Sequence, residues 1–150
     1  ELRVTLAMLR DEPAAPRAPT PGLAELRSLV AGAERAGLPV EVRVEGAVRD
    51  LPPAIDTAAF RIVQESLTNV MRHAGPARAC VAVVYAPDGV EIEVVDDGVG
   101  LGGANGSHAG HGIRGMHERA SMVGGRVEAG PRPEGGFRVR AHFPSEVMSS

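Results

Sequence analysis

The feature that most constrains the fold is a glycine-rich stretch, residues 98–112, which holds seven glycines and almost no large apolar side chains. Glycine loses more backbone entropy on folding than any other residue and places no side chain in a core. A stretch this long without its own secondary structure is typically functional. We therefore expect residues 98–112 to be a mobile or ligand-ordered loop, followed by a helix that starts near Ile113.

The segments around this stretch show clear helical and strand patterns. Apolar residues recur at helical spacing over residues 23–36, 53–74 and 113–123. Strand patterns cover residues 40–45, 79–86, 90–95, 126–129 and 137–143, and Pro87-Asp88-Gly89 indicates a hairpin turn. Strands and helices do not alternate strictly. We expect an α+β fold, a two-layer sandwich in which about three helices cover one face of a mixed sheet of about five strands.

The two ends of the chain have different patterns. Residues 1–10 carry a leucine stripe at helical spacing that is too short to be stable alone, and we interpret them as the end of a truncated helix. Residues 11–22 contain four prolines among alanines, which indicates a semi-rigid linker. We expect the folded domain to span residues 23–144 and residues 145–150 to be a disordered tail. The chain begins without methionine, so we expect it to derive from a longer protein.

Composition excludes several kinds of chemistry. All 16 basic residues are arginine, and a P-loop, a eukaryotic-type protein kinase or a Schiff-base enzyme would each need a lysine. A net charge of -3 provides no basic face, so we expect no direct contact with nucleic acid. No apolar stretch approaches the roughly 20 residues that span a bilayer, and the single cysteine fits a reducing compartment. We expect a cytoplasmic domain, and this composition leaves membrane anchoring of a longer parent protein open.

Three polar residues recur every four positions along the long helical segment: Glu65, Asn69 and His73. A step of four residues turns only about 40° past a full helical turn, so the three side chains share one face. The carboxylate and amide oxygens are hard ligands of the kind Mg²⁺ binds. The alternative, an ordinary solvated helix face, is more frequent for such residues, and spacing alone leaves both open.

Two glycine motifs follow. Asp96 and Asp97 lie at the end of a strand, directly before Gly98 and Gly100. A carboxylate there can accept a hydrogen bond from an exocyclic amine, and glycine leaves room for a flat ring. The alternative is a glycine-rich turn capped by acidic residues. The run Gly110 to Gly115 matches the dinucleotide pattern G-x-G-x-x-G. We reject a Rossmann fold because no hydrophobic strand directly precedes it. A glycine loop entering a helix N-terminus, which suits phosphate, remains.

Taken together and in this order, these motifs resemble those of the GHKL ATPases, and within them the ATP-binding domain of sensor histidine kinases. Residues 60–74 resemble the N box of that family, residues 96–100 its G1 box and residues 110–116 its G2 box. The following Glu118-Arg119 is similar to the subgroup with a short two-helix dimerisation and phosphoacceptor module. The resemblance covers about residues 23–143 and implies the histidine kinase-like ATPase fold.

The resemblance also implies a role for each motif. Asp96 would accept a hydrogen bond from the adenine amino group, and Asn69 would bind Mg²⁺ through its amide oxygen. Glu65 would be catalytic, orienting the attacking nucleophile or a metal-bound water, and residues 101–109 would form the lid. The remaining residues around ATP would be Arg72, His73, Gly98, Gly100, Gly110, His111, Gly112, Ile113, Gly115 and Met116.

The implied activity is that of a protein-histidine kinase. In the intact protein, a homodimer, the domain would transfer the γ-phosphoryl of Mg-ATP to a histidine on upstream dimerisation helices, from which it would pass to a response regulator. By the resemblance, residues 1–10 would be the last turns of the second dimerisation helix, without the phosphoacceptor histidine, so we expect a monomeric fragment that does not autophosphorylate alone. An anti-sigma-factor serine kinase and a degenerate domain that only binds nucleotide remain as alternatives. Zinc binding by His108, His111 and His117 with Cys80 is disfavoured, because no Cys-x-x-Cys accompanies them.

Overall fold

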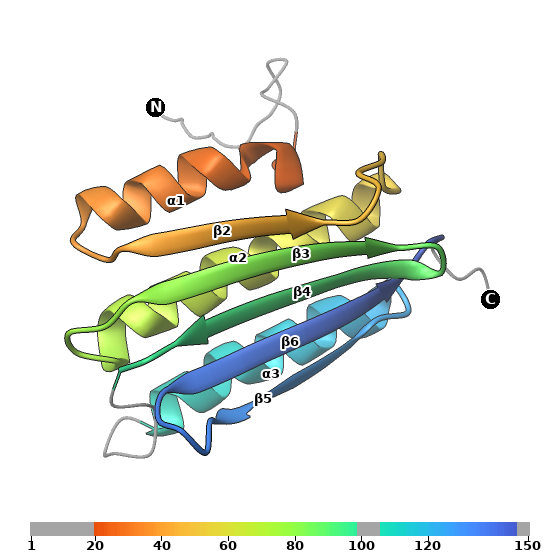
Figure 1. Ribbon diagram of the computed structural model, residues 1–150. Helices are drawn as coiled ribbons and strands as arrows, with labels where there is room; N and C mark the ends of the chain where they lie inside the picture. Colours follow the sequence, from red (N-terminus) through yellow and green to blue (C-terminus); the bar gives the residue numbers. More distant parts are fainter. Residues whose placement is uncertain (1–19, 99–105, 147–150) are drawn as a thin grey trace, which may run out of the picture.

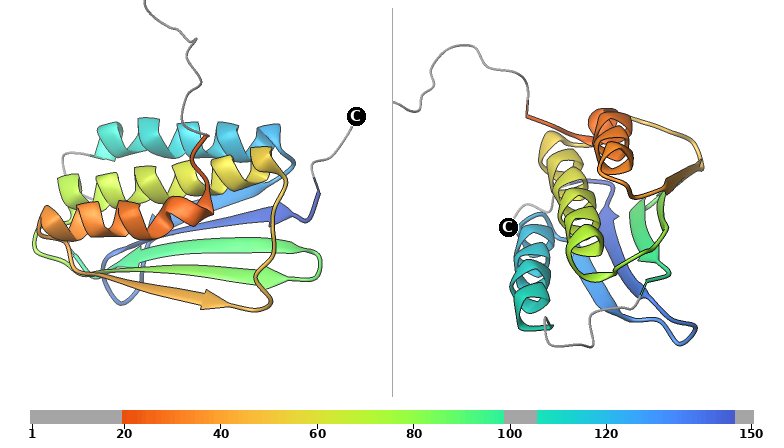
Figure 2. Two further views of the ribbon diagram at one scale, coloured as in Figure 1. Left: turned by 90° about the horizontal axis from the view of Figure 1, so that it is seen from above. Right: turned by 90° about the vertical axis from the view of Figure 1, so that its left-hand side faces the viewer.

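The computed structural model describes residues 20–98 and 106–146. A sheet of five strands forms one layer, and three α-helices form the second layer on one face of that sheet (Figures 1 and 2). The predicted α+β two-layer sandwich is therefore confirmed. The truncated helix at residues 1–10, most of the linker and the last four residues of the tail lie outside the described part of the chain.

The helical layer follows the apolar periodicity. A short 3₁₀ helix η1 (Leu23–Glu25) leads into α1 (Leu26–Arg35), and the long helix α2 spans Pro53–His73. Proline is favoured in the first turn, where its missing N–H has no intrahelical partner. Helix α3 spans Gly106–Met122. The side chains of Ile55 and Ile62 are fully buried, so α2 turns its apolar stripe toward the sheet.

The strands form one mixed sheet in the order β2-β3-β4-β6-β5. Strand β2 pairs in parallel with β3, whereas the β3–β4, β4–β6 and β5–β6 pairs are antiparallel. In the register of β4 and β6, Val94 lies opposite Val139 and Val95 lies opposite Arg138, which brings the end of β4 beside the start of β6. The bounds are β2 Val40–Glu45, β3 Ala79–Ala86, β4 Gly89–Asp96, β5 Arg126–Pro131 and β6 Phe137–Pro144.

One expectation about the glycine-rich stretch is wrong. Helix α3 begins at Gly106, well before the start predicted at Ile113, so the last part of the expected loop and lid is helical. The glycines of this stretch have low helix propensity, which is why the sequence pattern predicts the later start. The part of the lid at residues 101–105 lies outside the described residues.

The core lies between the sheet and the helical layer. Its largest fully buried side chains include Leu67 from α2, Ile92 and Phe143 from the sheet, and Met116 from α3. Each such side chain contributes about 1.5–3 kcal/mol when removed from water. Strand β2 lies at the edge of the sheet, and there Val44 remains 47% exposed. Within residues 20–98 and 106–146, no helix combines the length and apolar character needed to cross a bilayer.

Candidate functional site

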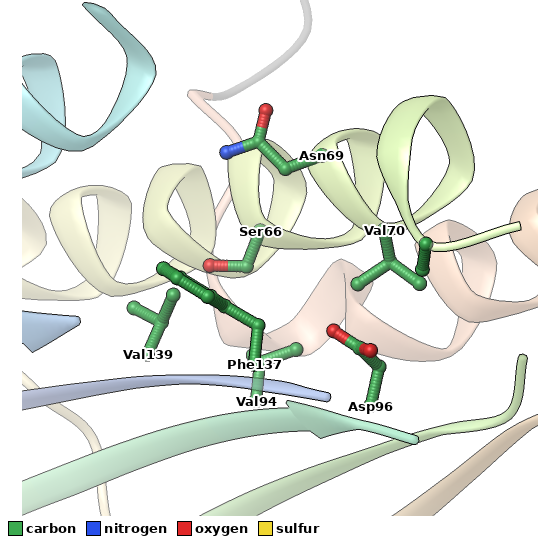
Figure 3. Close-up of a pocket in the computed structure, with 8 residues that line it drawn as sticks. Ser66, Asn69, Val70, Val94, Asp96, Phe137 and Val139 are labelled. Atoms are coloured by element: carbon green, nitrogen blue, oxygen red, sulfur yellow. The ribbon is translucent and has the colours of Figure 1, made fainter. Parts of the chain in front are cut away.

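A narrow crevice opens between α2 and the ends of β4 and β6 (Figure 3). Ser66 and Val70 point down from the helix, while Asp96 and Phe137 rise toward it from the sheet. The cavity volume is about 10 Å³. A polar acceptor thus stands among apolar walls, the usual composition of a small-molecule site. The lining residues are Ser66, Asn69, Val70, Ala74, Val94, Asp96, Phe137 and Val139.

Asp96 is the acidic side chain of this crevice and is only 4% exposed. Its Oδ1 accepts a hydrogen bond of 2.8 Å from the backbone N–H of Gly98. Burial raises the pKa of Asp96, and the neighbouring charge of Asp97 adds to that effect. The N–H groups of Gly98 and Phe137 and the charge of Arg132 act in the opposite direction. The protein therefore holds a desolvated acceptor that interacts strongly with any donor entering the crevice.

The adjacent acid has a different environment. Asp97 is exposed, and its Oδ1 accepts a hydrogen bond of 2.7 Å from the backbone N–H of Arg78. Its own N–H donates to the Arg78 carbonyl at 3.2 Å. These two bonds extend the pairing between β3 and β4 by one residue. Asp96 is thus the member of the pair that faces the crevice, as the alternation of a strand requires.

Glu65 and Asn69 lie on the side of α2 that meets α3. A Cβ added at Gly112 would stand 2.5 Å from Glu65 Oε2 and 3.4 Å from Asn69 Nδ2. The helices can approach this closely because Gly112 has no side chain. In Figure 3 the Asn69 amide points away from Asp96. The predicted acceptor for adenine and the predicted metal ligand therefore line the same crevice, with the Asn69 amide directed away from the Asp96 carboxylate.

The two basic residues at the end of α2, Arg72 and His73, differ in their burial. Arg72 is exposed, while His73 is half-buried. Among the described residues, the Nδ1 atom of His73 is buried without a hydrogen-bond partner. A buried nitrogen of this kind is costly unless a ligand or water satisfies it. Arg72 lies in the last turn of α2, where a positively charged side chain interacts favourably with the helix dipole.

The predicted residues from the second glycine motif occupy α3. Met116 is 1% exposed, and its sulfur accepts a bond of 3.6 Å from the Ser66 hydroxyl, so its side chain packs beneath the crevice. Ile113 is half-buried and packs against the core. Gly100 lies outside the described residues, as do the side chains of the helical residues before Gly112. The α3 residues concerned are Gly110, His111, Gly112, Ile113, Gly115 and Met116.

Sequence reasoning misses the part of the crevice that comes from the β5–β6 turn. Arg132 donates a hydrogen bond of 2.9 Å to the backbone carbonyl of Asp96. A Cβ at Gly136 would overlap that same carbonyl oxygen. Phe137 follows directly and lines the crevice. The available signal is the paired glycine in the turn before β6, but its proximity to Asp96 depends on long-range strand pairing.

Comparison with known proteins identifies a family for the chain. Residues 55–147 match the family model described as histidine kinase-, DNA gyrase B-, and HSP90-like ATPase. The chain is 31% identical over 125 residues to the sensor histidine kinase YxjM of Bacillus subtilis, covering 82% of this chain and 30% of that protein. It is 32% identical over 110 residues to the sensor histidine kinase LnrJ of the same organism, covering 73% and 27%.

The fold is also similar to solved structures. The histidine kinase domain of the Erythrobacter litoralis EL346 blue-light activated histidine kinase superposes with a TM-score of 0.63 at 19% identity. That match covers 89% of this chain and 66% of the other. The chain spans less than a third of the length of the two Bacillus relatives.

Proposed function

Because the chain belongs to the family of histidine kinase-, DNA gyrase B- and HSP90-like ATPases, we propose that it is the ATP-binding catalytic domain of a sensor histidine kinase. ATP binding comes with this family. The transfer of phosphate to histidine is the activity named in the Bacillus relatives, which are much longer than this chain. We place the domain in the cytoplasm, where ATP is available, in a parent protein that passes phosphate to a response regulator.

The observation that carries this proposal is the buried carboxylate of Asp96 at the end of β4. It faces a crevice with apolar walls, including Val70 and Val94, that suit the faces of a planar base. The exocyclic amine of adenine would donate to Asp96. Such a charge-assisted hydrogen bond contributes about 1.5–3 kcal/mol. A base without an amine at that position would offer Asp96 no donor, so the same carboxylate would provide base specificity.

The polar face of α2 would bind the phosphates and their metal ion. Asn69 Oδ1 and the Glu65 carboxylate are hard oxygen donors, and the close approach of Gly112 brings both beside α3. Among the side chains that the structure describes, no three His, Cys, Asp or Glu residues come together in a way that could hold a metal ion. Mg²⁺ typically takes one or two protein ligands and fills its shell with phosphate oxygens and water, so this donor set fits it. Bound Mg²⁺ would neutralise charge on the phosphates.

In the reaction, an imidazole nitrogen of the acceptor histidine would form a bond to the γ-phosphorus. The bond from that phosphorus to the bridging oxygen would break, and ADP would leave. Glu65 would orient the incoming nucleophile, and Arg72 and His73 would lie near the phosphates. Catalysis of this kind depends on positioning and charge neutralisation rather than on a covalent protein nucleophile. The acceptor would lie on the dimerisation helices of the homodimeric parent protein.

Transfer of label tests the kinase against the degenerate nucleotide-binding domain. The 150-residue chain is mixed with the dimerisation helices of the parent protein and γ-labelled Mg-ATP. Acid-labile, alkali-stable label on those helices would support the kinase, since phosphohistidine has this stability. Tight ATP binding without transfer would support a domain that only binds nucleotide. Label on serine of a separate protein would support the anti-sigma-factor kinase.

The metal role of Asn69 needs its own test. Asn69→Ala removes the amide oxygen, and we expect the enhancement of ATP affinity by Mg²⁺ to be lost in this variant. Thr68→Ala is a matched control, because the Thr68 hydroxyl bonds only the backbone carbonyl of Gln64 among the described residues, at 2.9 Å. If calorimetry shows equal enhancement by Mg²⁺ in Asn69→Ala and in the control, the assignment of Asn69 is wrong.

A further inference from the structure

The crevice beside Asp96 is too small for the ligand that its chemistry selects. Its volume of about 10 Å³ is close to the minimum of roughly 10–15 Å³ that holds one water molecule. A purine base is many times larger. Under the proposed function, on which this inference rests, part of the lining must therefore move before adenine can reach Asp96.

The burial of the lining residues shows which of them is able to move. Seven of the eight are buried, at 7% exposure or less, and they lie within β4 or β6, within α2 or directly at its end. Phe137 is the exception, since its side chain is half-buried. Backbone shifts in packed helices and strands disturb many neighbours at once, whereas a partly exposed side chain can change rotamer alone. Phe137 is thus the lining residue that is least restrained.

Contacts of the β5–β6 turn hold the backbone next to Phe137 in place, so a movement of this residue would be a rotation of its ring. The preceding residue, Gly136, has a φ of 88° and lies directly against the carbonyl of Asp96. Arg132, at the other side of the turn, donates to that same carbonyl at 2.9 Å. In Figure 3 the ring extends between α2 and the sheet toward Ser66, within the crevice that Asp96 also lines.

We propose that the ring of Phe137 is a gate that occupies the base site and must rotate out before adenine can pair with Asp96. The gate makes Phe137 a specificity-determining residue, because a base is retained only if its bond to Asp96 offsets the packing that the ring gives up when it rotates. The apparent association constant for ATP is the intrinsic one multiplied by the fraction of molecules in which the ring is outside. Removing the ring therefore strengthens binding.

A static stacking wall is the competing role for an aromatic residue at this place. Aromatic rings that pack on a ligand stabilise it, so truncation of a wall would weaken binding. Truncation of a gate would do the opposite. The direction of the change in affinity thus separates the two roles.

The test compares the wild-type chain with Phe137→Ala and Phe137→Leu. Stopped-flow fluorescence with ATP labelled on the ribose measures association, and calorimetry with unlabelled Mg-ATP measures Kd. For Phe137→Ala we expect association at least about fivefold faster and a Kd about three- to tenfold lower, with Phe137→Leu between it and wild type. We also expect the wild-type rate to level off with ATP concentration, because ring rotation then limits it, and the Phe137→Ala rate to stay linear.

Phe137→Leu retains apolar packing and serves as the test variant if Phe137→Ala does not fold. An unchanged association rate, or a Kd raised more than about threefold in either folded variant, would overturn the gate and support a stacking wall. If wild type and both variants all failed to bind ATP, the proposed function would fail and the gate with it. Binding by wild type with no gain in the variants would overturn the gate alone.

Discussion

The guanidinium of Arg132 donates a hydrogen bond of 2.9 Å to the backbone carbonyl of Asp96, which joins the β5–β6 turn to the end of β4. The two residues are 36 positions apart in the chain. Asp96 presents its carboxylate to the crevice, and its backbone is therefore positioned by a turn that contributes no acidic side chain to that crevice. This connection leads to the first two predictions.

Arg132→Ala should weaken ATP binding by about three- to tenfold while the protein remains folded. A hydrogen bond from a charged group contributes about 1.5–3 kcal/mol, and we expect part of this energy to hold Asp96 in position for ATP. Glu134→Ala is the matched control. It removes the exposed partner of Arg132, at 2.9 Å, and leaves the bond to Asp96 in place. Exposed ion pairs contribute about 0–1 kcal/mol, so the control should bind ATP normally in calorimetry. Equal affinities for wild type and Arg132→Ala would refute the positioning role.

Gly136→Ala should lower the free energy of unfolding by about 1–3 kcal/mol or more, because the new Cβ would overlap the Asp96 carbonyl at a φ of 88°. Gly135→Ala separates the two causes. It has a similar φ of 104° with nothing within 4 Å of its Cβ, so it carries the backbone strain alone. Urea denaturation of both variants measures the difference. Equal losses would show that contact with Asp96 does not matter.

The elements that sequence patterns identify correctly are those with a strong local period. The alternation in residues 137–143 predicts β6, and the apolar stripe of residues 53–74 predicts α2. The sequence places the start of α3 too late because Gly110 and Gly112 have poor helix propensity, whereas the helix continues through both. A local pattern does not report tertiary contacts such as that of Gly112 with Glu65 on α2.

The residues of the candidate site also differ in whether a local sequence pattern can locate them. Asp96 can be located from sequence, because an acid at a strand end before glycine is a local signal. Phe137 and Arg132 cannot, because they reach Asp96 only through the antiparallel register of β4 and β6 and the conformation of the turn before β6. Register depends on pairing between segments far apart in the chain. The roles assigned to Glu65 and Asn69 remain predictions.

Asp96→Asn should make the protein more stable at pH 7, by about 1 kcal/mol, because functional sites often sacrifice stability. Burial raises the pKa of Asp96, so the folded state favours the protonated carboxyl. The protonated carboxyl of Asp96 stabilises the folded state fully below the ordinary pKa of 3.8, and this stabilisation is lost as the pH rises through the higher pKa of the folded state. The advantage of the variant should therefore shrink as the pH falls toward about 4. Urea denaturation of both proteins at several pH values measures this, and a constant difference would contradict it.

Gly112→Ala should leave stability within about 1 kcal/mol of wild type but reduce phosphate transfer. The new Cβ would stand 2.5 Å from Glu65 Oε2, the end of a flexible side chain, so Glu65 would shift while the fold stays intact. Gly115→Ala gains the same helix propensity with no atom within 4 Å of its Cβ, so it is the control for the change in stability only. Thermal unfolding and transfer of label to the dimerisation helices measure the two effects. Full transfer by Gly112→Ala would remove Glu65 from the catalytic role.

The central claim is that Asp96 recognises the adenine amine, and calorimetric titration of Mg-ATP into the wild-type chain and Asp96→Asn tests it most directly. Asparagine keeps the size of the side chain but loses the charge that strengthens the hydrogen bond. We expect a Kd at least about tenfold higher in the variant, which corresponds to the loss of about 1.4 kcal/mol. The same affinity in both proteins would contradict the claim.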